Sequence, residues 1–338
     1  MRAAFITAKQ TVEVRDVPTP EPREDEVRIR VDYVGVCGSD LHYYFEGANG
    51  AFVVQEPLVP GHELSGRIDF DPKGEWAPGT GVTVHPARFG DSQPGIEDDP
   101  HLWPNGSYLG SASTWPHTQG ALAEQLVVDR SMIRVLPESL TVRTAVLAEP
   151  LAVAMHGVAK AGDAIKGARV LVTGSGPIGL LAIAAALDAG AASVTATDVL
   201  EGPLQRALGM GAEAAINVAT DEVPEGAFDV VLECSGVAPS ISTAFHAARK
   251  AATVVQIGMV PNEPRPVNLA PFISKELRVY GTFRFKDEID AAISLLAKRP
   301  EIELVITHEF DAGNTAELFA VARDSEASGK VIATVWPE

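Results

Sequence analysis

The spacing of hydrophobic and polar positions changes near residue 141 of the chain. Before that point, short runs rich in β-branched residues are bounded by Pro, Gly or Asp, a pattern typical of strands joined by turns. The predicted strands are residues 2–7, 11–17, 26–36, 64–70, 81–85, 122–128 and 133–136. Strands at this spacing favour a barrel-like all-β unit. Residues 86–120 show little periodicity, which predicts a long excursion from that unit.

After residue 141 the pattern becomes helical up to residue 161, interrupted only by Pro150, and strands and helices then alternate. The predicted strands are residues 169–173, 193–198, 228–233, 253–257 and 277–283, and the predicted helices are residues 178–189, 203–210 and 239–250. Alternation of this kind predicts an α/β fold with a parallel sheet that has helices on both faces. A final predicted strand, residues 330–336, could return to the first unit.

Composition narrows the class of protein. A chain of 338 residues is long enough for two domains that each bury a core. The formal net charge of −18 argues against a nucleic-acid partner, because a phosphate backbone requires clustered Lys and Arg. The longest apolar run, residues 178–187, is too short for a membrane span. Two cysteines and an N-terminus without a signal-peptide pattern lead us to expect a cytoplasmic protein.

A glycine fingerprint, VLVTGSGPIG, occupies residues 170–179 between a predicted strand and a predicted helix. In such a fingerprint Gly174 permits a tight turn, Gly176 lets the backbone approach a pyrophosphate, and Gly179 lets helix and strand lie close together. The free N–H groups of the helix N-terminus then face the phosphates. We therefore expect a dinucleotide at this turn, with Pro177 and Ile178 among the residues that bind it.

The end of the next predicted strand indicates which dinucleotide binds. Asp198 lies nineteen residues after Gly179, and a carboxylate there suits the hydroxyls of a ribose. No Arg follows directly, and Glu201 adds a second carboxylate that would repel a 2′-phosphate. The sequence therefore favours NAD over NADP. Ser235 and Gly258, which follow two later strands, are further candidates for the cofactor site.

A metal site is predicted at residues that lie far apart in the chain. Cys37 follows the strand at residues 26–36, on what we expect to be a loop, and Cys37, His62 and either Glu63 or Glu149 would supply three ligands. Zinc takes thiolate, imidazole and carboxylate ligands, and a catalytic site leaves one position open. Adjacent residues of an extended segment point in opposite directions, so His62 and Glu63 can both ligate only where the backbone bends. Gly61 allows that bend, and both carboxylates remain candidates.

Four ordered motifs, GVCGSDLH, PGHE, AEPLAV and VTGSGPIG, resemble the zinc-dependent medium-chain dehydrogenases over nearly the whole chain. CGSDLHYYFEG and the segment GTFRF at residues 281–285 are most similar to the sorbitol (polyol) and L-idonate 5-dehydrogenase group. The resemblance implies a GroES-like β-barrel catalytic domain at residues 1–148 and a Rossmann domain at residues 149–285. It further implies a C-terminal segment, residues 286–338, that returns to the catalytic domain, and a homo-oligomer, either tetramer or dimer.

The resemblance also implies roles for single residues. Ser39 would accept the proton of the substrate hydroxyl, and Tyr43 would contact the substrate. Arg284 follows the last strand of the nucleotide domain, where its guanidinium could grip a carboxylate with two hydrogen bonds. Many members of the family carry a second, structural zinc on four cysteines. This chain has no cysteine between Cys37 and Cys234, so only the catalytic zinc is expected.

The function that these observations favour is the zinc- and NAD-dependent oxidation of a secondary hydroxyl of a sugar acid, with L-idonate converted to 5-keto-D-gluconate. A sorbitol- or xylitol-type polyol dehydrogenase is the alternative, and a threonine dehydrogenase, which shares the GHE and EPL patterns, is the third. A different class is a dinucleotide-binding protein without turnover. Relatives of that kind typically lose the metal ligands, and here Cys37, His62, Glu63 and Glu149 are all present.

Overall fold

The computed structural model describes residues 1–336, and the chain forms two compact units. Unit 1 contains Met1–Glu149, Ile289–Asp324 and the C-terminal stretch from Lys330, and unit 2 contains Pro150–Glu288 and Ser325–Gly329. The strands of unit 1 are β1 (Arg2–Ala8), β2 (Thr11–Asp16), β3 (Glu26–Gly35), β4 (Ala48–Asn49), β5 (Phe52–Val53), β6 (Glu63–Phe70), β7 (Gly81–Val84), β8 (Ala87–Arg88), β9 (Ser107–Tyr108), β10 (Gln125–Asp129), β11 (Ile133–Val135), β18 (Ile306–Asp311) and β19 (Lys330–Thr334). Its helices are α1 (Gly38–Glu46), α2 (Val142–Ala145), α8 (Ile289–Lys298) and α9 (Thr315–Arg323).

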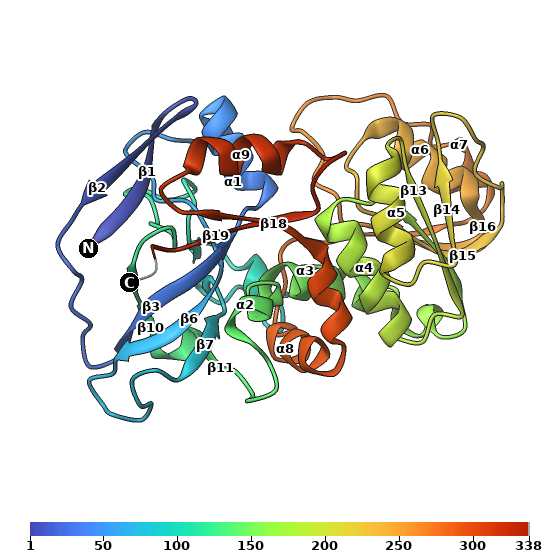
Figure 1. Ribbon diagram of the computed structural model, residues 1–338. Helices are drawn as coiled ribbons and strands as arrows, with labels where there is room; N and C mark the ends of the chain where they lie inside the picture. Colours follow the sequence, from blue (N-terminus) through green and yellow to red (C-terminus); the bar gives the residue numbers. More distant parts are fainter. Residues whose placement is uncertain (337–338) are drawn as a thin grey trace. The chain divides into compact units, whose positions relative to one another are not determined.

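Unit 1 is organised around a seven-stranded sheet in which six strands follow the order β11-β7-β6-β3-β19-β18 and the seventh, β10, pairs with β3 (Figure 1). The first half of β3 also pairs with β10, and its last residues pair with β19. In β3 the buried positions Val27, Ile29 and Val31 alternate with more exposed ones, as expected for a strand with one face on the core. The C-terminal strand β19 therefore lies next to the strand that leads to Cys37.

Unit 2 is a six-stranded sheet in which every pair of neighbouring strands is parallel, in the order β14-β13-β12-β15-β16-β17. Its strands are β12 (Arg169–Thr173), β13 (Ser193–Asp198), β14 (Ala214–Asn217), β15 (Phe228–Glu233), β16 (Ala248–Gln256) and β17 (Arg278–Gly281). Its helices are α4 (Pro177–Asp188), α5 (Glu201–Gly209), α6 (Ala238–Ala247) and α7 (Ala270–Ser274), and α3 (Ala148–Lys160) begins in unit 1 and continues here. The predicted parallel sheet is confirmed, and β12 is at the point where the strand order reverses.

Two local predictions were wrong. The stretch from Cys37 to His42 is not a loop as expected: Cys37 is the N-cap of α1, which begins at Gly38 and continues to a left-handed C-cap at Gly47. The helix is only nine residues long and opens with Gly-Ser-Asp, residue types that also favour turns, so its periodicity is hard to recognise. The helix predicted at residues 239–250 ends at residue 247, because Ala248 already belongs to β16.

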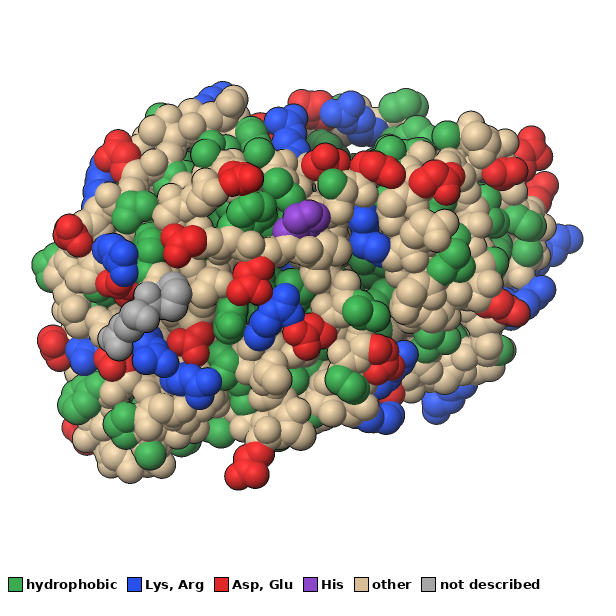
Figure 2. All heavy atoms as spheres, viewed as in Figure 1, with side chains coloured by type: hydrophobic (Ala, Val, Ile, Leu, Met, Phe, Trp, Pro, Cys, Tyr) green, Lys and Arg blue, Asp and Glu red, His purple; other side chains and the backbone are tan. Residues whose placement is uncertain are grey.

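Two further observations concern the length of the helices and the distribution of charged side chains on one face. Among residues 1–336, no helix is long and apolar enough to span a membrane. On the face shown in Figure 2, acidic and basic side chains are interspersed with apolar ones, and no extended basic area is visible there.

Candidate metal centre and cofactor loops

Three side chains of unit 1 offer ligand atoms to one point. The ligand atoms of Cys37, His62 and Glu63 all lie within 4.8 Å of one another. His62 and Glu63 are buried, and Cys37 is half-buried. Thiolate, imidazole and carboxylate are the ligand types that zinc prefers in proteins. The fold thus brings together three of the four ligands proposed from the sequence.

Asp40 and Gly61 join the two segments that carry these ligands. One carboxylate oxygen of Asp40 accepts the N–H of Cys37, and the other accepts the N–H of Gly61, both at 3.0 Å. Gly61 has a φ of 98°, in the left-handed region, so the bend expected at this residue is present. As a result, His62 and its neighbour Glu63 can both present ligand atoms to the same group.

Glu63 is held by residues of two neighbouring strands. It is paired with Gly35 of β3, and a methyl group at Gly35 would lie 2.2 Å from Glu63 Oε2, so only glycine leaves room for the carboxylate. Lys330, the first residue of β19, donates to Glu63 Oε1 at 2.7 Å and to the carbonyl of Val36 at 3.0 Å. The side chains of Lys330 and Glu63 are 3% and 1% exposed. This is a fully buried ion pair beside the candidate ligands.

Glu149 is next to this group and has a different partner. It lies in the first turn of α3, and its Oε1 accepts a hydrogen bond of 2.5 Å from the hydroxyl of Tyr108. The ring of Tyr108 is also edge-on to the imidazole of His62, with 5.4 Å between the ring centroids. Among the described residues, the group of three does not include Glu149. Its role as a metal ligand stays a prediction.

The electrostatics of the centre favour a cation. Burial lowers the pKa of His62, but its interaction with Cys37 raises it, with help from Asp40 and Glu149, and the pKa reaches about 10. Burial also lowers the pKa of Lys330, yet Glu63 and Cys37 raise it above the ordinary lysine value. Burial raises the pKa of Glu149. These directions describe a buried centre with an excess of negative charge.

A count of the ionisable groups also indicates that the centre favours a cation. The count includes Asp40, whose carboxyl oxygens accept two backbone N–H groups and whose pKa is raised by burial. The acidic groups Cys37, Asp40, Glu63 and Glu149 then face two basic groups, His62 and Lys330, so acidic groups outnumber basic ones by two. In residues 1–336, the buried atoms His62 Nδ1 and Glu63 Oε2 have no hydrogen-bond partner. The donor set therefore fits a divalent cation such as zinc.

In unit 2, the fingerprint turn is shaped by its glycines. Gly174 has a φ of 84°, and a methyl group on Gly179 would lie 1.9 Å from the carbonyl oxygen of Gly174. Around Gly176, a methyl group would have no protein atom within 4 Å. Gly176 is the N-cap of α4, and Pro177 occupies the first turn. Helix and strand are therefore in direct contact at Gly179, while the backbone at Gly176 stays open to a ligand.

Asp198 ties this turn to the end of β13. Its Oδ2 accepts the N–H of Ser175 at 2.9 Å, and its Oδ1 accepts the N–H groups of Val199 and Leu200 at 2.8 and 3.1 Å. These contacts fix the carboxylate beside the fingerprint. Its contact with a ribose stays a prediction.

The loops that follow β12, β15 and β16 touch one another. A methyl group on Gly174 would lie 2.8 Å from Ser235, and one on Gly258 would lie 2.3 Å from the nitrogen of Gly236. Gly174, Ser235 and Gly258, which the sequence assigned to the cofactor site, are thus brought together at one edge of the parallel sheet. This is the edge where folds of this kind bind dinucleotides.

Comparisons with known proteins give the family. A model of zinc-binding dehydrogenases matches residues 177–298, and a model of the alcohol dehydrogenase GroES-like domain matches residues 23–138. The chain is 31% identical to the L-idonate 5-dehydrogenase (NAD(P)(+)) of Escherichia coli strain K12, over 98% of this chain and 97% of that protein. It is 34% identical to the sorbitol dehydrogenase of Gallus gallus, over 91% of this chain and 89% of that protein. The chain belongs to the zinc-binding medium-chain dehydrogenases.

The solved structures agree with this assignment. The crystal structure of L-idonate 5-dehydrogenase from Escherichia coli covers 98% of this dehydrogenase and 97% of its own chain, with a TM-score of 0.90 and 30% sequence identity. The predicted α/β fold, with a GroES-like domain and a Rossmann-type sheet, is confirmed. This dehydrogenase is a zinc-dependent, NAD(P)-linked enzyme of the sorbitol dehydrogenase group that acts on polyols or sugars.

Three predicted site residues of the dehydrogenase lie outside the ligand group. Ser39 is half-buried in the first turn of α1. Tyr43 is 2% exposed; its hydroxyl accepts the N–H of Ala112 at 3.2 Å and lies 3.4 Å from the hydroxyl oxygen of Ser111. Arg284, in unit 2, has a φ of 54°, and its guanidinium stacks on the ring of Phe283. The roles of Ser39, Tyr43 and Arg284 stay predictions.

Sequence reasoning missed four residues that support these sites. Lys330 opens an otherwise apolar strand, and an isolated charge there was a usable signal. Glu233 closes β15 after the apolar residues Val230, Val231 and Leu232, directly before Cys-Ser-Gly. Tyr108 lies in the aperiodic stretch at residues 86–120, and Gly35 lies within a strand. In the sequence, Tyr108 looks like any residue of a loop and Gly35 like any residue of a strand, so neither could be singled out from the pattern.

Proposed function

We propose that this dehydrogenase oxidises a secondary hydroxyl of a sugar acid, L-idonate, to the ketone 5-keto-D-gluconate and transfers a hydride to NAD. The observation that carries this proposal is the Cys37, His62 and Glu63 group, around which acidic side chains outnumber basic ones. In the balanced reaction the carbon loses a hydride to NAD and the hydroxyl loses a proton to solvent.

In unit 1, different side chains bind the metal, pass on the proton and contact the substrate. When bound, zinc supplies a Lewis acid that lowers the pKa of the substrate hydroxyl. Cys37, His62 and Glu63 hold the metal, and Glu149 is the alternate carboxylate. Ser39, two residues beyond Cys37, passes the released proton outward. Tyr43 contributes to the substrate-binding surface.

The fingerprint turn of unit 2 holds NAD. Its phosphates approach the open backbone at Gly176 and the N-terminus of α4, which attracts negative charge. NAD is favoured over NADP because Asp198 and Glu201 would repel a 2′-phosphate. The Escherichia coli relative bears the name NAD(P)(+), so both cofactors belong in the assay.

An acid substrate needs a local cation, because a net charge of −18 repels anions at long range. Arg284 is our candidate, since its guanidinium can bind a carboxylate with two hydrogen bonds. The alternative function is a sorbitol- or xylitol-type polyol dehydrogenase, which the likeness to the Gallus gallus enzyme favours. The two proposed functions differ in whether the substrate carries a carboxylate.

The test is NADH or NADPH formation by the purified, zinc-loaded protein with L-idonate, D-gluconate, sorbitol, xylitol and L-threonine in turn. We expect turnover of L-idonate with NAD. Arg284→Ala should raise KM for L-idonate about tenfold while leaving any polyol activity within about twofold, since one charge-assisted contact is lost. Turnover of sorbitol but not of L-idonate would replace the sugar-acid proposal by the polyol alternative.

We further propose that the enzyme is a cytoplasmic homo-oligomer, either a dimer or a tetramer, joined through unit 2. The strand β17 is at the edge of the parallel sheet and is exposed along its length. Ile273, Val279, Tyr280 and Phe283 are exposed apolar residues around it. An uncovered apolar edge of this kind favours pairing with another chain. Both cysteines are free, which fits a reducing compartment.

A further inference from the structure

Glu233, the last residue of β15, is a buried carboxylate with no place in the reaction proposed above. Its exposed fraction is 0%. Its Oε1 accepts hydrogen bonds from Thr173 Oγ1 at 3.2 Å, from the N–H of Ser235 at 3.1 Å and from Ser240 Oγ at 3.0 Å. The hydroxyl of Ser235 donates to the same oxygen. One carboxylate oxygen thus collects donors from three separate segments.

The second oxygen has donors of its own. Oε2 of Glu233 accepts the N–H of Gly236 at 2.9 Å and the side-chain amide of Gln256. All six donors to the two oxygens are neutral hydroxyl, amide or backbone groups. A buried charge without an ionic partner is tolerated when several dipolar donors converge on it, and each of these donors is held in place in return.

The positions of the donors explain what the carboxylate holds. Thr173 is the last residue of β12, Gln256 is the last residue of β16, and Ser240 lies in the first turn of the ten-residue helix α6. The strands β12, β15 and β16 are neighbours in the sheet. Directly after these strand ends come the loops that carry Gly174, Ser235 and Gly258, the candidate cofactor residues. A single side chain therefore links all three loops at the ligand-binding edge.

We propose that Glu233 is the positioning residue of the dinucleotide site, fixing the loops after β12, β15 and β16 so that the pyrophosphate and nicotinamide meet a preformed backbone. The proposal rests on the proposed binding of NAD at this edge. Preorganisation lowers the entropic cost of binding, so loosening the loops should weaken cofactor affinity more than it slows the chemical step.

The decisive variant is Glu233→Gln, which keeps the shape but replaces one acceptor oxygen by a donor NH₂. That NH₂ group then meets hydroxyl and N–H donors, so at least one charge-assisted hydrogen bond is lost. NADH affinity is measured by titrating the zinc-loaded protein with NADH and following fluorescence, and zinc content by metal analysis. We expect the Kd for NADH to rise about tenfold or more, with unchanged zinc content. KM for NAD should rise while kcat at saturating NAD changes by less than about threefold.

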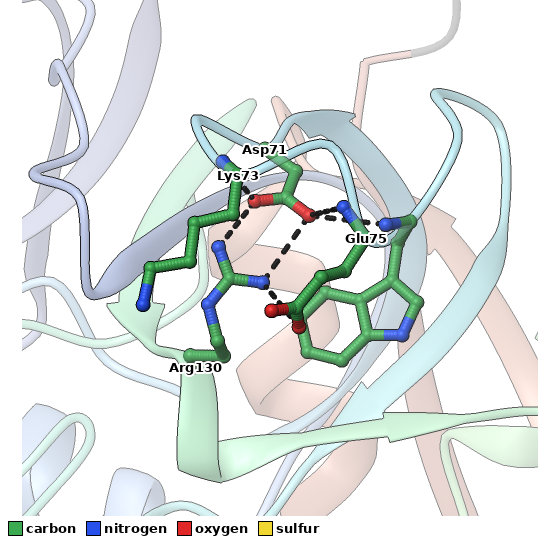
Figure 3. A network of polar contacts seen from close by, with 5 residues as sticks. Asp71, Lys73, Glu75 and Arg130 are labelled. Atoms are coloured by element: carbon green, nitrogen blue, oxygen red, sulfur yellow. Dashed lines mark hydrogen bonds and ion pairs between the residues drawn. The ribbon is translucent and has the colours of Figure 1, made fainter.

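Asp71→Asn is the matched control. Asp71 is also a buried carboxylate that accepts three backbone N–H groups, those of Lys73, Glu75 and Trp76, and it pairs with Arg130 (Figure 3). It belongs to unit 1, outside the cofactor loops. This variant should lower the melting temperature and leave the Kd for NADH unchanged. Equal loss of NADH affinity in both variants would show a general loss of stability instead of positioning.

Two milder variants cover the case in which Glu233→Gln does not fold. Ser240→Ala and Thr173→Val each remove one donor to the carboxylate, and each should raise the Kd for NADH about two- to fivefold. An unchanged Kd in both of them, or in Glu233→Gln, overturns the proposal. Wild-type protein that binds neither NADH nor NADPH overturns the proposed function itself, so the two failures are distinguishable.

Discussion

The metal centre of unit 1 and the cofactor loops of unit 2 are built in opposite ways. In unit 1, charged side chains converge, and each of the two candidate carboxylate ligands has one side-chain partner: Lys330 for Glu63 and Tyr108 for Glu149. In unit 2, the loops are shaped by backbone contacts at glycines that leave no room for a methyl group, as at Gly179. The first site is a balance of charges, and the second is a close fit of backbone against backbone whose loops are joined by neutral hydrogen-bond donors to Glu233.

This difference predicts what each site tolerates. A charge balance is broken by removing one group, even when the shape is kept, because the remaining groups are buried without compensation. A backbone fit is broken by adding a single methyl group, even when the charge is unchanged. Metal content and NADH affinity report on the two sites separately, so variants in one unit can serve as controls for the other.

The largest effect is expected for Cys37→Ser. Loss of the thiolate removes one of three ligand groups that lie within 4.8 Å of one another. Zinc as a Lewis acid contributes several kcal/mol to the transition state, so kcat/KM should fall on the order of a thousandfold. Zinc content per chain should drop, and the Kd for NADH should stay within about twofold of wild type.

The matched control for the loss of a thiol is Cys234→Ser, which should retain zinc because Cys234 belongs to unit 2. If Cys37→Ser kept both its zinc and its turnover after treatment with a chelator, the metal centre would have to be placed elsewhere in the chain.

Gly179→Ala should break the other site. The new methyl group would lie 1.9 Å from the carbonyl oxygen of Gly174, so the fingerprint turn must shift. We expect NADH affinity to fall by about a hundredfold, with normal zinc content. Gly209→Ala is the control, because Gly209 lies in α5 and a methyl group there meets nothing within 4 Å. Comparable NADH binding by the Gly179 and Gly209 variants would argue against the fingerprint as the phosphate site.

The same contrast explains how much could be predicted from the sequence. The fingerprint and its sheet were predictable, because glycine spacing and strand–helix alternation are local patterns. Cys37, His62 and Glu63 were predictable as candidates because Cys and His are rare in this chain and all three residues stand in recognisable motifs. The choice between Glu63 and Glu149 as a metal ligand could not be predicted, because it depends on the partners of each carboxylate. Lys330, the partner of Glu63, lies 267 positions away in the chain.

The helix α1 and the role of Tyr108 could not be predicted, because both lie in short or irregular elements. The helix α1 begins with Gly-Ser-Asp and ends after nine residues, so neither length nor period distinguishes it from a loop. Tyr108 lies in a two-residue strand, β9, whose pairing with β8 fixes its position. Such short strands have no periodicity of their own. Their conformation is set by tertiary contacts, which overrule local preference.

Tyr108→Phe should have a smaller effect, confined to unit 1. The ring and its contact with His62 remain, and only the hydroxyl that donates to Glu149 at 2.5 Å is lost. Partners of metal-site residues typically contribute a factor of 10 to 100 in metal affinity, so zinc should bind about tenfold more weakly. The measurement is competition with a chelator of known affinity.

For this test, Tyr44→Phe is the control, since the hydroxyl of Tyr44 donates to the carbonyl of Gln10 and not to a residue of the metal group. Zinc affinity equal to wild type in the Tyr108 variant would mean that Glu149 is not oriented through this hydroxyl.

The smallest effect concerns Asp71, the counterpart in unit 1 of Glu233. Glu233 is held by neutral donors, whereas Asp71 is paired with the guanidinium of Arg130 (Figure 3). The hydrogen bond from Arg130 holds the pKa of Asp71 well below its usual range, against the opposing effect of burial. A depressed folded-state pKa stabilises the protein above the unfolded-state pKa of about 3.9, and this contribution is lost as the pH falls through the folded-state value.

Asp71→Asn should therefore lower the melting temperature by a few degrees at neutral pH, and the gap to wild type should narrow below about pH 4. Thermal unfolding of both proteins across this range measures the gap. A gap that stays constant down to the lowest pH at which both proteins fold would mean that the backbone hydrogen bonds of Asp71, which do not require its charge, hold the loop. In that case Asp71 and Glu233 would both act as acceptors for neutral groups, and they would differ only in where they lie in the molecule.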